Sequence, residues 1–229
     1  MTNFTKTTRT LAALLVSGTA LTGIASAAEL SANIGVTNDY IWRGMTQSAG
    51  TSSVSGGLDV DFGNGFAAGT WIADVDFGNA STATQEQDYY ISYSGEAGGL
   101  NYDVGYILYT YDADDSDFDE VYITVGAMGL SASYYYLLDA DFDNAAGEST
   151  DAGDSTYISV DYETEVGGYG VGVHYGVYDA EDLIVGFEES TDMSVSLSKD
   201  DFTIAYITTD DLTGKDDEDR FVISWGTSF

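Results

Sequence analysis

The chain of 229 residues contains no cysteine and no proline. Proline normally makes up about 5% of a protein, and it is excluded from sheet interiors because it cannot donate a hydrogen bond to a strand ladder. Its absence therefore favours a protein built from sheet. Without cysteine there are no disulfides, which many secreted domains with small cores rely on. Some other feature must stabilise the fold.

Basic residues are also scarce, with six Lys and Arg against 39 Asp and Glu. A polyanion repels phosphate, and the sequence has no basic stripe, so nucleic acid is excluded as a partner. Strong acidity can indicate disorder, but disordered chains lack aromatic residues. This chain has 18 Tyr, 10 Phe and 3 Trp, which predicts a folded protein with aromatic surfaces.

The first 27 residues are typical of a signal peptide. Lys6 and Arg9 precede the apolar stretch 11–24, and Ala25-Ser26-Ala27 fits the small residues that a signal peptidase requires. A membrane anchor is the alternative, but about 14 apolar residues are too few for a helix that spans a bilayer. We expect export, cleavage after Ala27 and one mature domain over 28–229, with four basic residues and a formal charge of −35.

Beyond the leader, the sequence has no run of 18 apolar residues, so a helical membrane protein is excluded. Large apolar residues instead alternate with small or polar ones, as in strands with two unlike faces. About twelve such segments occur: 30–45, 51–62, 66–77, 86–97, 100–111, 119–128, 130–139, 156–166, 169–179, 190–199, 202–209 and 219–229.

The connections between these segments alternate between tight and long. The tight ones are rich in glycine, whereas the long ones, such as 112–117, 139–154, 180–189 and 210–217, are acidic. A secreted Greek-key sandwich has no reason to segregate its connections in this way. A bacterial outer-membrane barrel has short periplasmic turns, long outer loops and an even strand number. We therefore predict an all-β, transmembrane, antiparallel up-and-down barrel of about 12 strands, with 10 or 14 as alternatives.

The chain ends on Phe229, and large residues recur at every second position before it at Phe221, Ile223 and Trp225. This pattern resembles the C-terminal signal that outer-membrane proteins present to the barrel assembly machinery. An ordinary amphipathic terminal strand is the alternative. The predicted location is the outer membrane of a Gram-negative cell, reached through the periplasm, with membrane lipid and lipopolysaccharide as neighbours.

Nearly all of the mature chain resembles the TorF-type family, whose members are described as outer-membrane porins. The stretches that carry the resemblance are 38–44 (NDYIWRG), 57–71 (GLDVDFGNGFAAGTW), 102–106 (YDVGY), 120–122 (EVY) and 220–229. None of these is a chemical motif. The resemblance implies an outer-membrane barrel, and it bears on fold and location more than on the solute.

No residue pattern indicates an enzyme or a cofactor. The single histidine, His174, is placed by parity in the lumen among glycines. Lipases built on barrels use a Ser/His pair, but they act on lipid from the outside, so a lumenal His174 faces the wrong way. We predict no catalytic residue.

The acidic loops are weak candidates for divalent cations, because oxygen-rich clusters suit hard ions such as calcium. The candidate residues are Asp114, Asp117, Asp139, Asp141 and Asp143. The second cluster lacks the Gly and Glu that an EF-hand loop needs, having Asn144 and Thr150 at those positions. A solvated anionic surface is the simpler interpretation, and no dedicated metal site is predicted.

The predicted function is passive diffusion of small solutes, favouring cations because the mouth is acidic. A structural or surface-interaction barrel with a plugged lumen is the alternative, since small barrels fill with side chains. Gly and Ser on the inward faces favour a gap, whereas inward tyrosines such as Tyr109 and Tyr178 favour a plug. The solute and the oligomeric state stay undetermined.

Candidates for the lumen or a constriction are Arg43, Arg220, Asp39, Asp59, Asp61 and His174. The expected closure of the last strand on the first would place Arg43 and Arg220 side by side at the outer end of the barrel. They would either line a constriction opposite acidic groups or each pair with an Asp at the seam.

Overall fold

The computed structural model describes residues 28–78, 80–113, 116–143, 147–180, 189–212 and 218–229. These residues form a closed antiparallel barrel of twelve strands and a separate two-stranded hairpin. The predicted fold class is therefore confirmed. No helix among these residues is long and apolar enough to cross a membrane. The signal peptide predicted for residues 1–27 lies outside the described residues.

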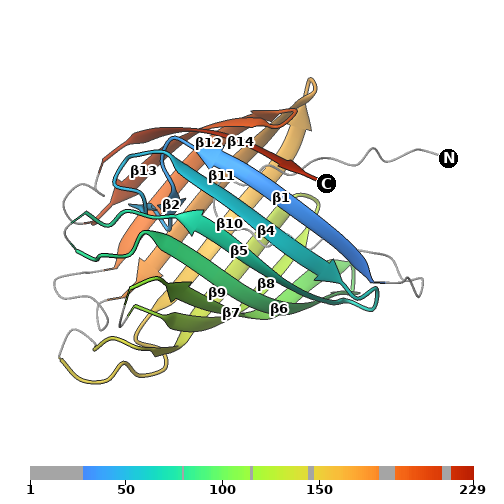
Figure 1. The fold of residues 1–229 in the computed structure, drawn as a ribbon. Helices are drawn as coiled ribbons and strands as arrows, with labels where there is room; N and C mark the ends of the chain where they lie inside the picture. Colours follow the sequence, from blue (N-terminus) through green and yellow to red (C-terminus); the bar gives the residue numbers. More distant parts are fainter. Residues whose placement is uncertain (1–27, 79, 114–115, 144–146, 181–188, 213–217) are drawn as a thin grey trace.

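The barrel strands follow one another around the wall, and the last closes on the first (Figure 1). Val36 of the first strand pairs with Trp225 of the last, and Val36 also pairs with Val54 on its other side. The strands are β1 (Glu29–Thr37), β4 (Ser53–Asp61), β5 (Phe66–Asp74), β6 (Gln85–Ala97), β7 (Leu100–Tyr111), β8 (Phe118–Ala127), β9 (Leu130–Ala140), β10 (Thr156–Val166), β11 (Tyr169–Asp179), β12 (Ser190–Lys199), β13 (Phe202–Asp210) and β14 (Arg220–Ser228).

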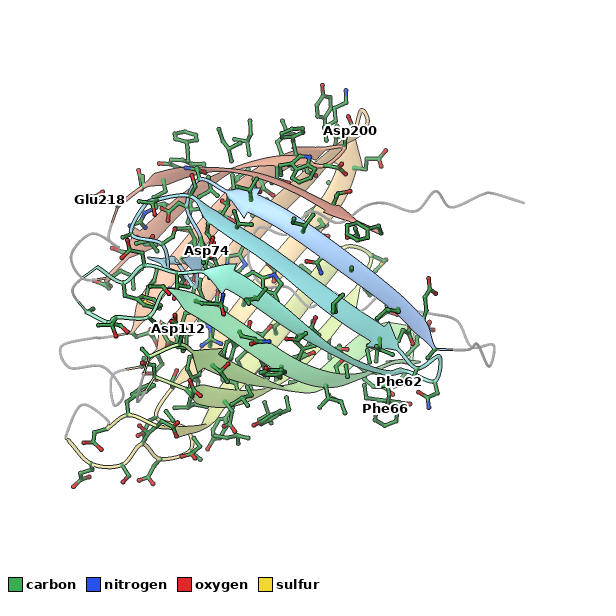
Figure 2. The ribbon with its side chains drawn as sticks, viewed as in Figure 1. Phe62, Phe66, Asp74, Asp112, Asp200 and Glu218 are labelled. Atoms are coloured by element: carbon green, nitrogen blue, oxygen red, sulfur yellow. The ribbon has the colours of Figure 1, made fainter. Side chains whose placement is uncertain are left out.

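The two ends of the barrel differ, as the connections predicted. At one end, here called the turn end, adjacent strands are joined by short turns such as Gly98-Gly99 and Gly167-Gly168, whose glycines all have positive φ. At the other end, the loop end, the connections are longer and acidic. Figure 2 shows Asp74, Asp112 and Glu218 at the loop end and Phe62, Phe66 and Asp200 at the turn end. The start of β1 and the end of β14 both lie at the turn end.

The two faces of the wall follow from the alternation. Large apolar residues at alternate positions point outward and are exposed, for example Val195, Leu197 and Ile204, whereas their neighbours on the same strands, such as Asp192 and Ala205, are buried inside. Outward aromatic rings lie near both ends, with Phe66 and Phe202 toward the turns and Tyr89 and Phe221 toward the loops, whereas Tyr134 and Tyr206 lie near mid-strand. An exterior of this kind suits hydrocarbon with aromatic girdles at its two interfaces.

The predicted bounds of most strands agree with the structure, but the first segment, predicted as 30–45, is wrong. β1 ends at Thr37, and the chain then forms β2 (Ile41–Trp42) and β3 (Met45–Thr46), a two-stranded hairpin with Trp42 paired to Met45. The segment 38–52, here called the inner loop, contains buried residues including Tyr40, Arg43 and Ser48. The alternation in this segment resembles that of a wall strand because the hairpin is also β structure. The two hairpin strands pair with each other, however, and their side chains contact residues of the lumen.

Candidate functional site

The tip of the inner loop is a tight turn in which both central residues, Arg43 and Gly44, have positive φ, of 49° and 80°. Such a turn favours Asn or Gly at both positions, and a large side chain at the first one is strained. Gly44 is required by packing as well. A Cβ there would lie 2.7 Å from Thr209 Cγ2 and 2.9 Å from Asp192 Cβ. The tip is therefore pressed against β12 and β13.

Arg43 extends from this tip into a pocket of the barrel wall. Its guanidinium donates two hydrogen bonds to the carboxylate of Glu120, at 2.8 Å from Nη1 to Oε1 and 2.7 Å from Nη2 to Oε2. Both side chains are almost fully buried, with exposed fractions of 4% and 1%. A bidentate pair of this kind is among the strongest polar contacts in proteins.

Four aromatic rings complete the pocket around this cation. The Arg43 Cζ lies 4.2 Å from the ring centroid of Trp42, 5.2 Å from Tyr135, 4.7 Å from Tyr157 and 5.0 Å from Tyr178. Distances below about 6 Å allow cation–π attraction, which strengthens on desolvation. We call Glu120, Tyr135, Tyr157 and Tyr178 the cation cage. Its members come from the adjacent strands β8, β9, β10 and β11, whereas Trp42 belongs to the inner loop itself.

The base of the inner loop is held by a second set of contacts. Asp39 accepts hydrogen bonds from the hydroxyls of Thr46 and Ser48, at 2.5 and 3.1 Å. Tyr40 donates from its hydroxyl to Glu86 on β6 at 3.0 Å. Together with the cage, these bonds attach the loop to the interior of the barrel.

Arg220 on β14 also contacts the inner loop. Its Nη1 donates to the carbonyl of Gly44 at 3.2 Å, and its Nε lies 3.6 Å from Asp39 Oδ2. Arg220 thus contacts the loop that carries Arg43. The expected arrangement of the two arginines on neighbouring strand ends is wrong, because Arg43 is not on β1. The carboxylate partner of Arg43 is Glu120, and Asp39 lies beside Arg220.

Asp88 follows Glu86 on the inward face of β6 and is fully buried. Its polar neighbour is the carboxyl group of Glu86, and no hydroxyl or N–H among the described residues donates to either oxygen of Asp88. Two neighbouring buried carboxyl groups are costly to ionise together. A proton or a cation in the lumen would relieve this cost.

His174 lies between two carboxylates rather than in open solvent. Its Nδ1 is 2.6 Å from Asp161 and its Nε2 is 2.8 Å from Asp192, and the hydroxyl of Tyr157 lies 2.9 Å from Nε2. Ionised carboxylates only accept hydrogen bonds, so the arrangement favours a cationic imidazole with both nitrogens donating. Tyr157 belongs to the cation cage as well, which joins the two clusters.

Asp59 and Asp61, the remaining lumen candidates, lie nearer the turn end on the inward face of β4. Asp59 accepts a hydrogen bond from the Tyr90 hydroxyl. Asp61 accepts one from the backbone of Gly63 at 2.7 Å, which fixes the adjacent turn. These contacts anchor Asp59 and Asp61 within the wall, at the end of β4 that lies far from the inner loop.

A cavity of about 170 Å³ lies beside the inner loop, lined by residues of β1, β4, β5 and β10–β14. Arg43, Asp39 and Tyr157 border it, and so do Asp161, His174 and Asp192. The rest of its wall combines serines, including Ser55, Ser194, Ser196 and Ser224, with apolar residues such as Trp71, Ile207 and Trp225. The cavity therefore joins the ionic clusters to the small-residue part of the lumen.

Of the weak divalent-cation candidates, Asp117 and Asp141 are neighbours, because the Asp141 amide donates to the Asp117 carbonyl at 2.9 Å. Among the described residues, no group of three or more His, Cys, Asp or Glu could hold a metal ion. Asp117 accepts from the backbone of Tyr111, and Asp143 bridges to Ser149 within its own loop. Asp114 lies outside the described residues, and Asp139 pairs in register with Asp119.

Sequence reasoning missed the cation cage and the acidic group of Glu86 and Asp88. The available signal was parity, since Glu120 and Tyr122, like Glu86, Asp88 and Tyr90, occupy alternate positions that face inward. Parity alone does not reveal which of these residues meet, because they come from different strands.

Two solved structures resemble the whole barrel. The first, from a study of the in-meso crystallization of membrane proteins, has a TM-score of 0.50 at 10% identity and covers 87% of this chain and 83% of its own. The second, a structure of the NanC porin, has a TM-score of 0.51 at 12% identity and covers 87% of this chain and 98% of its own. At these identities the likeness is one of fold alone, the closed barrel that the NanC porin also forms.

Sequence comparison gives a different kind of result. Among proteins with curated descriptions, none is similar in sequence to this chain. The sequence profile of one family, described as a bacterial protein of unknown function (Gcw_chp), matches residues 22–220. The match spans most of the chain and nearly the whole barrel, so the protein belongs to the Gcw_chp family.

Proposed function

We propose that this protein is an outer-membrane channel for passive diffusion of small solutes and that it favours cations. The observation that carries the proposal is the closed wall with an apolar exterior and a polar, acidic interior. A spanning sheet must close on itself because hydrocarbon offers its backbone no hydrogen-bond partners. A barrel in water would gain nothing from exposing residues such as Leu58 and Val195.

The tight turns would then face the periplasm and the long acidic loops the cell exterior. Export needs a leader, and residues 1–27 are the signal peptide that the sequence predicts. The TorF-type resemblance supports the same location. We expect the barrel to keep its compact form in cold detergent, so boiled and unboiled samples should migrate differently on a gel. Identical mobility would contradict a closed membrane barrel.

Assembly would depend on the last strand. Phe221, Ile223 and Phe229 point outward and are exposed, with Trp225 on the same face partly covered, so they are accessible to the barrel assembly machinery. Deleting Phe229 should lower the amount of protein in the outer membrane without altering the lumen. Normal levels of the truncated protein would rule out this role.

The lumen chemistry supports cation preference. Asp59, Glu163 and Asp192 line the interior, and the loops carry more acidic residues. In planar bilayers with a salt gradient, the reversal potential should indicate cation preference at low salt. The preference should weaken as the Debye length falls from about 30 Å at 0.01 M to about 3 Å at 1 M. Anion preference at low salt would contradict the proposal.

A second function is favoured by the inner loop. The loop crosses the lumen from β1 to the cation cage and to β12, so the barrel could act as a closed structural or surface-interaction protein. Conductance separates the two functions. A channel gives stepwise currents with the intact chain, whereas a closed barrel gives none until the inner loop is removed.

A further inference from the structure

The cation cage has the composition of a ligand site, although the chain fills it with its own side chain. A carboxylate that binds both ends of a planar cation, with tyrosine rings on its remaining sides, is suited to guanidinium-bearing solutes. Glu120 and Tyr178 are buried to 1% and 3% exposure, so water competes weakly there. The chemistry selects a planar, singly charged donor over a sodium or potassium ion.

Arg43 lies on the inner loop and is not part of the barrel wall. All cage members stand on four adjacent wall strands, whereas Arg43 reaches them from the tip of the inner loop. Its backbone has a φ of 49°, in a turn where glycine would be unstrained. The turn itself therefore gains nothing from arginine at this position, and the reason for it lies in the contacts of the side chain.

A cavity lies on one side of the cage. The cavity beside the inner loop is bordered by Arg43 and Tyr157, and it carries Asp161 and Asp192 on the same side. With the cationic His174 between them, these two carboxylates leave one net negative charge next to the cage, which attracts cations. Serine hydroxyls in the remainder of the cavity, such as those of Ser194 and Ser196, offer hydrogen bonds to a polar body attached to the cationic group.

We propose that the cation cage is a binding site for solutes that carry a guanidinium group, and that Arg43 occupies it as a tethered competitor. A solute that enters the cage displaces the tip of the inner loop, which couples recognition to opening of the lumen. This inference rests on the proposed channel function, because it names the class of solute, but binding itself needs no current.

The test uses the full mature barrel refolded in detergent, with Arg43→Gly as the central variant. Glycine at this φ keeps the turn unstrained and empties the cage. Methylguanidinium at millimolar concentration is the probe, and N-methylurea is the neutral control of the same shape. We expect methylguanidinium to raise the Tm of Arg43→Gly along a saturable curve, with N-methylurea giving no shift.

Two further variants keep the test decisive. Arg43→Gly combined with Glu120→Gln should lose the response, because the bidentate acceptor is gone. Lys199→Gln, which removes a basic residue at the turn end of β12 and leaves the inner loop and the cage unchanged, should behave as the wild type. In the wild type the tethered arginine competes for the same site, so half-saturation should require more methylguanidinium than in Arg43→Gly, by a factor of one plus the ratio of the effective concentration of Arg43 to its dissociation constant.

If Arg43→Gly fails to refold, Arg43→Lys provides the same comparison with a cation that cannot bind Glu120 at both oxygens. Equal shifts with N-methylurea, or no saturable shift in either variant, would overturn the site. Bilayer currents separate this failure from that of the channel. Absent binding with normal potassium current rejects the guanidinium site alone, whereas saturable binding without any current rejects the channel alone.

Discussion

The two halves of the lumen are built on different principles. Toward the loops, large side chains fill the interior: Ile107, Tyr109, Leu137 and Tyr178 are buried together, and Trp42 packs against them. Toward the turns, the inward residues are small, as with Gly57, Gly172 and Ser196. The difference shows that one wall of constant architecture can carry a packed core at one end and a hollow at the other.

The physical reason lies in how each half is stabilised. In the loop half, burial of aromatic rings and paired charges holds the inner loop across the lumen. In the turn half, the backbone ladder and the outer apolar face are sufficient, so the inward side chains are free to be small. The loop half should therefore be sensitive to single substitutions, and the turn half should tolerate them.

The largest effect is expected from Glu120→Gln, which leaves Arg43 buried without its charged partner. Breaking a buried ion pair on one side costs about 3–5 kcal/mol. The matched control in the turn half is Glu163→Gln, whose side chain is exposed on the same inner wall and should change stability by less than about 0.5 kcal/mol. Unfolding in urea from detergent micelles measures both, and equal losses would break the comparison.

A second experiment removes the inner loop from the packed half. Thr37 and Ser53 are register partners on β1 and β4, so residues 38–52 can be replaced by Asn-Gly, which forms a two-residue hairpin turn. We expect a closed barrel with normal heat-modifiable mobility and a severalfold larger conductance. An unchanged current would indicate that the constriction lies elsewhere, in the turn half.

A third substitution tests whether the turn half is hollow. Ser196 borders the cavity, and Ser196→Trp should narrow it with little effect on stability because the site has room for the ring. The conductance of the loop-replaced barrel should fall, and Ser196→Ala should leave it unchanged. A large loss of stability with Trp would show that the turn half is packed after all.

The smallest expected effect concerns Asp112, at the loop end just beyond β7. Its carboxylate accepts hydrogen bonds from the backbone and hydroxyl of Thr84 at 2.7 and 2.6 Å. These bonds hold the pKa of Asp112 below its usual value. The contribution to stability is therefore present above the unfolded pKa of about 3.9 and disappears as the pH falls through the lower folded value.

Asp112→Asn should remove that part of the acid dependence. The difference in Tm between Asp112→Asn and wild type should be visible near neutral pH and vanish below about pH 3. Because the carboxylate is solvent-exposed, the difference should also shrink at high salt. A difference that persists unchanged at low pH would mean that the bonds to Thr84 do not depend on ionisation.

Local pattern in the sequence determined the wall. Alternation with period two fixes which side chains face lipid, and the glycine turns and acidic loops fix the order of the strands, so the twelve-stranded barrel and most strand bounds were predictable. The direction of Tyr109, Tyr135 and Tyr178 followed from the same parity. These features depend on neighbours along the chain or on the adjacent strand.

The tertiary structure alone decided the interior. Alternation in 38–46 is the same for a wall strand and for a hairpin inside the lumen, and only the positive φ of Arg43 and Gly44 with their distant contacts separates the two. Glu120 meets Arg43 across 77 positions of sequence. Which charge meets which ring depends on the closure of the barrel and the register of four strands, and no local pattern carries that information.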